Sequence, residues 1–287
     1  MEIIVPIVTG ALTIMIPILF ASAGGLFSAL SGTLNIALEG LLLIGAFVSL
    51  SVFYFTGNVT ASVTAAALAS TAFSALHAFT VFKLRANVFI TGLAVNLLSS
   101  GLCIVISDKL FNTRGVVTAR NIQGLGGFYL FFALLLIFII WLVINKTAFG
   151  YRLRACDKNS EALFSLGIDP QSYKITALLI SGFLCGIGGS FLSLNLGVFV
   201  PGMSAGKGWI ALAVIFLGAR KPQGILGAAF VFALAESFSN YAQGFFRIPA
   251  DFILAFPYLC TLIVMISMSV ISNFSENQQK LARRTGF

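Results

Sequence analysis

The sequence has few charged residues and few side chains able to carry out chemistry. Only 9% of its 287 residues are charged, against about 25% in soluble domains. A single histidine and four widely spaced cysteines with no Cys-x-x-Cys pair argue against a metal site and against a membrane-embedded enzyme. The net charge of +8 comes from basic residues scattered over short loops, so nucleic-acid binding is not expected.

Long apolar runs dominate the chain instead. Its mean hydropathy is +1.02 and 59% of its residues are hydrophobic. Since a helix needs about 20 apolar residues to cross a bilayer, we predict membrane spans at residues 4–24, 38–56, 60–82, 88–107, 127–145, 173–196, 222–242 and 251–272. Segments 25–37 and 206–219 are apolar but short, which predicts two half-length or re-entrant pieces. The expected fold is an all-α polytopic bundle of about 8–10 transmembrane helices, forming one domain over residues 1–287.

The basic residues predict how the bundle is oriented. Most of the 17 Lys and Arg residues fall on one side of the predicted spans, the side of the loop at 146–172. Because cytoplasmic loops are enriched in these residues, we predict that this loop and the tail at 273–287 are cytoplasmic. The N-terminus then lies outside if segment 206–219 crosses the membrane.

Two polar residues open the otherwise apolar segment 31–46. Glu39 follows Asn35 by four positions, so both lie on one helical face. An ionisable group beside hydrocarbon usually faces a bundle interior or an aqueous cavity. Alternatively, Glu39 lies at headgroup level and stabilises the N-terminus of the following helix. The sequence leaves both interpretations open.

The predicted cytoplasmic loop contains signals for a short helix over residues 160–166. Asn159 is a good N-cap, Glu161 places an acid in the first turn, and Gly167 can adopt the left-handed conformation after the last turn. The apolar side of this helix consists of Leu163, Phe164 and Leu166. A helix this short needs a packing surface, which is either its own bundle or a groove in a cytoplasmic partner.

Glycine-rich segment 197–208 predicts irregular backbone at membrane depth, which is tolerated only in a protein interior or along a cavity. Segments 31–46 and 204–219 share one organisation: a small-residue lead, a charge, and an apolar half-helix. Asn96 and Asn195 could join helices or bind a solute. The candidate translocation pathway comprises Asn35, Glu39, Asn96, Asn195, Lys207, Trp209 and Glu236.

Several motifs together resemble one family of membrane proteins. They occupy residues 34–40, 84–87, 92–96, 154–156, 159, 167–168, 181–182 and 202–222. This set resembles the permease subunits of ATP-binding-cassette importers of the branched-chain amino acid and simple sugar superfamily. The likeness is greatest to the nucleoside branch, whose members work with lipoproteins of the basic-membrane-protein type.

The resemblance implies a set of partners in the bacterial inner membrane. They are a cytoplasmic ATPase subunit, a second homologous permease, an extracytoplasmic substrate-binding lipoprotein and membrane lipid. ATP and Mg would bind to the ATPase, because this chain has no Gly-x-x-x-x-Gly-Lys-Ser/Thr motif and is expected to bind no cofactor itself.

The resemblance also implies a coupling segment and a solute class. The loop residues implied to dock on the ATPase are Arg154, Asp157, Asn159, Glu161, Leu163, Phe164 and Gly167. The expected solute is a nucleoside, with simple sugars and branched-chain amino acids as alternatives. An ion-coupled secondary transporter is the remaining alternative, although it gives the loop helix no role.

Overall fold

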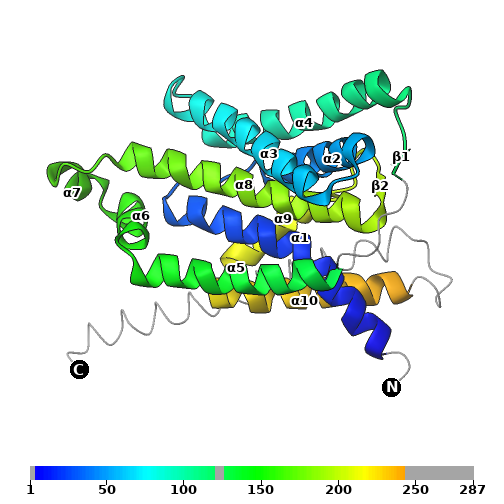
Figure 1. Cartoon of the computed structure of the whole chain (residues 1–287). Coiled ribbons are helices and arrows are strands. Elements are labelled where there is room, and N and C mark those ends of the chain that lie inside the picture. Colours follow the sequence, from blue (N-terminus) through cyan, green and yellow to red (C-terminus); the bar gives the residue numbers. More distant parts are fainter. Residues whose placement is uncertain (1–3, 120–125, 243–287) are drawn as a thin grey trace.

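The computed structural model describes residues 4–119 and 126–242 (Figure 1). Its helices are α1 (Ile4–Leu30), α2 (Leu38–Thr56), α3 (Val59–Phe82), α4 (Val88–Phe111), α5 (Gly126–Lys146), α6 (Ala148–Lys158), α7 (Ser160–Ser165), α8 (Pro170–Leu196), α9 (Lys207–Leu217) and α10 (Pro222–Ala242). Two short strands, β1 (Val117–Thr118) and β2 (Val198–Phe199), form one antiparallel pair.

Within these residues, seven helices are long and apolar enough to cross a membrane. They confirm the predicted polytopic helical bundle and coincide with seven of the predicted spans. The short helix α9, of 11 residues, confirms that segment 206–219 contains a half-length piece. The span expected at 251–272 and the tail at 273–287 lie outside the described residues.

The prediction of a separate half-helix at 25–37 is wrong. Helix α1 continues through Gly24 and Gly25 to Leu30, and only residues 31–37 are irregular. Glycine weakens a helix in isolation, but here both glycines lie where neighbouring helices approach closely. A Cβ on Gly24 would lie 2.9 Å from the Ser181 carbonyl oxygen, and one on Gly25 would lie 2.7 Å from Ile215. Tertiary packing therefore overrides the local propensity.

Helix α8 forms the centre of the bundle and packs mainly on α1, α2 and α3. Small residues allow this, because a Cβ on Gly45 of α2 would lie only 2.7 Å from the Gly186 carbonyl oxygen of α8. The hydroxyl groups of Ser49 and Ser193 join the same two helices at 2.8 Å. Such contacts hold helices together where hydrocarbon offers no hydrophobic driving force between them.

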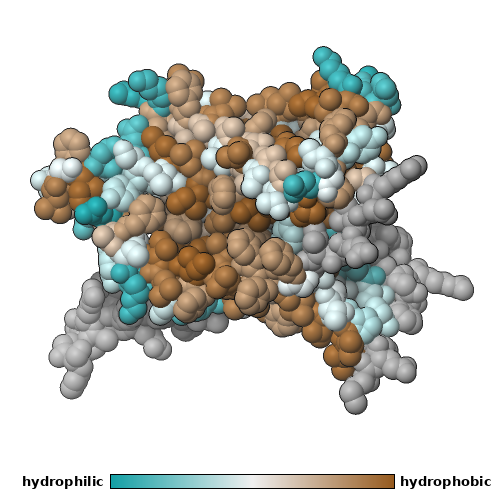
Figure 2. Space-filling model, viewed as in Figure 1, coloured by the Kyte–Doolittle hydropathy of each residue, from teal (hydrophilic) through white to brown (hydrophobic). Residues whose placement is uncertain are grey.

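The bundle has two distinct ends. Helices α6 and α7 lie at one end, here called the α7 end, and the β1–β2 pair lies at the other, the β end (Figure 1). Figure 2 shows apolar residues across the middle of the molecule and hydrophilic residues gathered toward these ends. This distribution fits a membrane whose surfaces lie near the two ends.

Candidate functional site

Two irregular segments run into the bundle from opposite ends. Segment 31–37 starts at the α7 end, where a Cβ on Gly32 would touch the Asp157 carboxylate of α6. It then reaches Asn35, whose amide donates to the Ser181 hydroxyl (2.9 Å). Ser181 lies about 16 Å along α8 from the first residue of that helix. Segment 200–206 follows β2 at the β end and leads to the start of α9. Helices α2 and α9 therefore both begin inside the bundle.

The Glu39 carboxylate joins the starts of these two helices. The backbone N–H of Gly206 donates to Oε1 (2.9 Å) and that of Gly208 donates to Oε2 (2.7 Å). Gly206 is the N-cap residue of α9 and Gly208 lies in its first turn, so neither N–H group has a partner within the helix. Although Glu39 lies in the first turn of α2, its carboxylate caps α9, where the helix dipole also favours a negative charge.

Close packing at Gly208 should make this junction sensitive to one methyl group. A Cβ there would collide with the backbone of Leu38 and Glu39, so Gly208→Ala should lower the free energy of unfolding by about 1–3 kcal/mol. Gly227→Ala in α10 is the matched control, because nothing lies within 4 Å of its Cβ position. Thermal unfolding of the purified chain measures both variants. Equal stability of the two variants would contradict the packing described.

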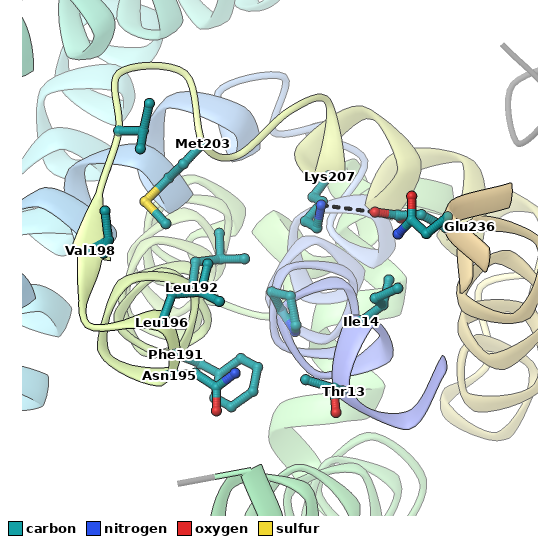
Figure 3. A pocket seen from close by; sticks show the side chains of 13 residues that line it. Thr13, Ile14, Phe191, Leu192, Asn195, Leu196, Val198, Met203, Lys207 and Glu236 are labelled. Atoms are coloured by element: carbon teal, nitrogen blue, oxygen red, sulfur yellow. Dashed lines mark hydrogen bonds and ion pairs between the residues drawn. The ribbon is translucent and has the colours of Figure 1, made fainter. Parts of the chain in front are cut away.

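A cavity of about 380 Å³ lies between α1, α8, segment 198–203, α9 and α10 toward the β end (Figure 3). It is lined by Thr13, Ile14, Pro17, Phe191, Leu192, Asn195, Leu196, Val198, Val200, Met203, Lys207, Glu236 and Asn240. We call it the central cavity. Its walls are mostly apolar, with a few amide and hydroxyl groups among them, as is usual for small-molecule sites.

The two charged groups of the central cavity neutralise each other. Lys207 Nζ lies 3.1 Å from Glu236 Oε1, and the two side chains are only 13% and 20% exposed (Figure 3). Among the described residues, the other carboxylate oxygen of Glu236 is buried and accepts no hydrogen bond. Because charges buried this far need partners, the pair leaves the described lining of the cavity without net charge.

The other predicted pathway residues lie elsewhere. The Asn96 amide donates to the Ile36 carbonyl (3.0 Å) and accepts from the Gly40 N–H (2.8 Å), which ties α4 to both sides of the α2 start. Trp209 is on the exposed side of α9. Thus Asn195, Lys207 and Glu236 line the central cavity, whereas Asn35, Glu39 and Asn96 hold the helix starts around it.

The predicted loop helix is present as α7, and the sequence did not predict the helix α6 before it. Gly167 adopts the expected left-handed conformation (φ 74°). The prediction that the Asn159 side chain caps α7 is wrong, since it makes no capping hydrogen bond. Asn159 also ends α6, with its N–H bonded to the Ala155 carbonyl, and this role fixes a backbone conformation unsuited to capping.

The loop side chains divide into an inward and an outward set. Leu163 is buried, whereas Phe164 is 74% exposed and Glu161 is exposed. The guanidinium of Arg154 lies 5.0 Å from the centre of the Tyr151 ring. Asp169, near the end of the loop, caps α8, and hydrogen bonds from the Ser172 hydroxyl and the Gln171 N–H hold the pKa of its carboxyl below the usual value.

An ion pair that the sequence did not reveal joins this loop to α9. Arg220 lies just beyond α9 and donates to the Asp157 carboxylate of α6 (3.2 Å). Residues with a left-handed backbone conformation flank α9 on both sides. Ala205 (φ 45°) and Gly206 precede it, and Ala219 (φ 52°) and Arg220 follow it. Since such conformations interrupt a helix, α9 is a short rod connected to the loop at one end and to Glu39 at the other.

Comparison with known proteins places the chain in a family. Residues 7–268 match the family described as "Branched-chain amino acid transport system / permease component". The nucleoside ABC transporter permease protein NupC of Lactococcus lactis subsp. cremoris is 32% identical, with 90% of each chain covered. The guanosine ABC transporter permease protein NupQ of Bacillus subtilis is 31% identical, again with 90% of each chain covered.

A more distant relative is the putative glucose ABC transporter permease protein TsgC13 of Haloferax volcanii, 27% identical over 79% of this chain and 74% of its own. No solved structure matches the chain. These matches confirm the resemblance drawn from the motifs and the expectation of a transporter subunit rather than an enzyme. The chain belongs to the branched-chain amino acid transport system permease family, the multi-pass membrane subunits of ATP-binding-cassette transporters.

Proposed function

We propose that this permease carries nucleosides into the cytoplasm. The observation that carries the proposal is the central cavity, whose described residues carry no net charge and combine apolar walls with the amides of Asn195 and Asn240 and the hydroxyl of Thr13. A nucleoside is neutral and offers a flat apolar face together with hydrogen-bonding edges. The names of NupC and NupQ, which are similar over 90% of the chain, support the same solute class.

Simple sugars are the nearest alternative, because the relative TsgC13 is named for glucose. A branched-chain amino acid, which carries both an ammonium and a carboxylate charge, fits a neutral cavity less well. An ion-coupled mechanism would need an available acid at membrane depth. Among the described residues, Glu39 is held by backbone N–H groups and Glu236 is held by Lys207.

Importers of this type work with an ATPase and a substrate-binding partner. We propose that the α7 end faces the cytoplasm of a bacterial cell, with residues 146–172 as the coupling loop and the C-terminus on the same side. The ATPase, carrying ATP and Mg, would dock there. A second, homologous permease would complete the path, and a lipoprotein would deliver the solute at the β end.

The connections of α9 supply a route from the ATPase to the cavity. A movement of α6 and α7 would act through the Asp157–Arg220 pair on the end of α9. Because α9 is one rigid helix of 11 residues, its other end would move with it. That end carries Lys207, which faces the central cavity, and the N–H groups held by Glu39.

Uptake of radiolabelled guanosine tests the proposed solute class. Cells expressing the permease with its ATPase, second permease and lipoprotein should take up guanosine in a manner that requires ATP. Unlabelled nucleosides in 100-fold excess should reduce uptake by about ten-fold, whereas ribose and leucine should leave it unchanged. Competition by ribose or leucine at the same concentration would move the solute to sugars or amino acids and contradict the proposal.

A further inference from the structure

A second cavity, of about 310 Å³, lies at the α7 end, far from the central cavity along the bundle. It is lined by Leu30, Trp141, Ile144, Asn145, Arg154, Arg220, Lys221, Pro222 and Gln223. We call it the basic cavity. Its residues come from the ends of α1 and α5, from α6, and from the connection between α9 and α10.

The basic cavity has more positive charge than its surroundings neutralise. It holds three cations, and only Arg220 has a carboxylate partner among the described residues, Asp157. Arg154 contacts neutral groups instead, the Asn145 amide oxygen (3.4 Å) and the Tyr151 ring. Lys221 forms no ion pair within the described part of the chain. An anion bound in the cavity would supply the missing negative charge.

The backbone adds to this preference for an anion. Ala219 and Arg220 are consecutive left-handed residues (φ 52° and 54°), a conformation that residues other than glycine seldom adopt. This turn places Arg220 and Lys221 directly before Pro222, the first residue of α10. The positive end of the α10 dipole is therefore at the same cavity.

Part of the cavity wall is apolar and includes Trp141 of α5, a helix that also has exposed apolar side chains. Trp141, Leu30 and Ile144 form this wall. The Trp141 ring stacks on Phe138 of α5 (6.1 Å between centroids), and Phe138 and Leu142 are exposed on the same helix. The cavity thus lies at the α7 end of the apolar α5 surface. An acyl chain lying along α5 would extend directly from a headgroup in the cavity.

We propose that the basic cavity binds the phosphate of an anionic phospholipid. Arg154, Arg220 and Lys221 pair with the phosphate, the amides of Asn145 and Gln223 contact the rest of the headgroup, and an acyl chain packs on Trp141. Anionic lipids are recognised in this way by basic pockets between helices on the cytoplasmic side of a membrane. A free phosphate would use the cations and leave the apolar wall without a role. The assignment holds whichever solute the permease carries.

Tryptophan fluorescence of the purified full-length chain tests the proposal. The chain has two tryptophans, so Trp209→Phe leaves only Trp141 to report on the cavity. We expect phosphatidylglycerol with brominated acyl chains to quench Trp141 at a lower lipid fraction than brominated phosphatidylcholine does. Adding Lys221→Gln should weaken this preference about five-fold. Adding Lys83→Gln, at an exposed lysine outside the cavity, should leave it unchanged.

A measurement on the wild-type chain guards against a folding defect in the Trp209→Phe variant. Phosphatidylglycerol should raise the midpoint of thermal unfolding of the wild-type chain more than phosphatidylcholine does. Inorganic phosphate should not reproduce this rise. Equal quenching and equal stabilisation by the two lipids would overturn the proposal. Stabilisation by inorganic phosphate as large as that by phosphatidylglycerol would overturn the assignment to a lipid.

Discussion

Replacing Glu39 with alanine is expected to reduce nucleoside uptake at least ten-fold and to destabilise the permease by about 2–5 kcal/mol. The carboxylate accepts the N–H groups of Gly206 and Gly208 at 2.9 and 2.7 Å. Hydrogen bonds to a charged group contribute about 1.5–3 kcal/mol each, and an unsatisfied N–H costs a similar amount where water is excluded. Without the carboxylate, the start of α9 loses its attachment to α2.

Two further variants separate this role from a general effect of removing an acid. Glu39→Gln keeps one acceptor oxygen of similar reach, so its loss of stability should be smaller than that of Glu39→Ala. Asp108→Ala removes an acid from an exposed ion pair with Arg114 and should cost less than about 1 kcal/mol. The measurements are guanosine uptake and thermal unfolding. If Glu39→Ala lowered uptake and stability no more than Asp108→Ala does, the Glu39 cap on α9 would contribute neither to transport nor to stability.

The arrangement of the helices was largely predictable because hydrophobic length is a local property. Each of the seven described spans coincides with a long apolar run, and Gly57, Gly167 and Gly197 adopt the left-handed conformation that ends a helix. The error at 25–37 came from ending the first span at Gly24 and treating the short apolar segment after it as a separate piece. The effect of Gly24 and Gly25 depends on close approach to Ser181 and Ile215, which are remote in sequence. Only the assembled bundle shows that glycine here serves packing.

The contacts of the candidate site residues could not be predicted from the sequence. Glu39 and Lys207 were recognised as charges in two apolar segments, of which only that of Lys207 is a half-length helix. Nothing in the sequence links Glu39 to N–H groups 167 and 169 positions away. A backbone donor is present at every residue except proline, so it leaves no compositional signal. The Asp157–Arg220 pair was missed for a related reason. Exposed Asp and Arg residues are common, and only the fold shows which of them meet.

The α7 surface provides the second large expected effect, because α7 presents an apolar side chain that its own bundle does not cover. Leu163 is 5% exposed and anchors the helix, whereas Phe164 and Leu166 are each 74% exposed. A helix of six residues is not stable alone in water. Its packing is therefore divided, with Leu163 toward the permease and Phe164 toward the proposed ATPase. Aromatic side chains that become buried when two proteins bind dominate many protein interfaces.

We therefore expect Phe164→Asp to abolish guanosine uptake and to prevent copurification of the ATPase, while the permease still inserts normally into the membrane. A charge in an apolar contact both loses the aromatic packing and introduces an unpaired carboxylate, so a loss of affinity of at least 100-fold is expected, or about 3 kcal/mol.

Phe164→Leu keeps an apolar side chain and should retain most of the activity. Val116→Asp places the same charge on an exposed residue beside β1. It should leave ATPase binding intact, because β1 lies at the opposite end of the bundle. Retention of both ATPase binding and uptake by Phe164→Asp would show that α7 is not the docking surface.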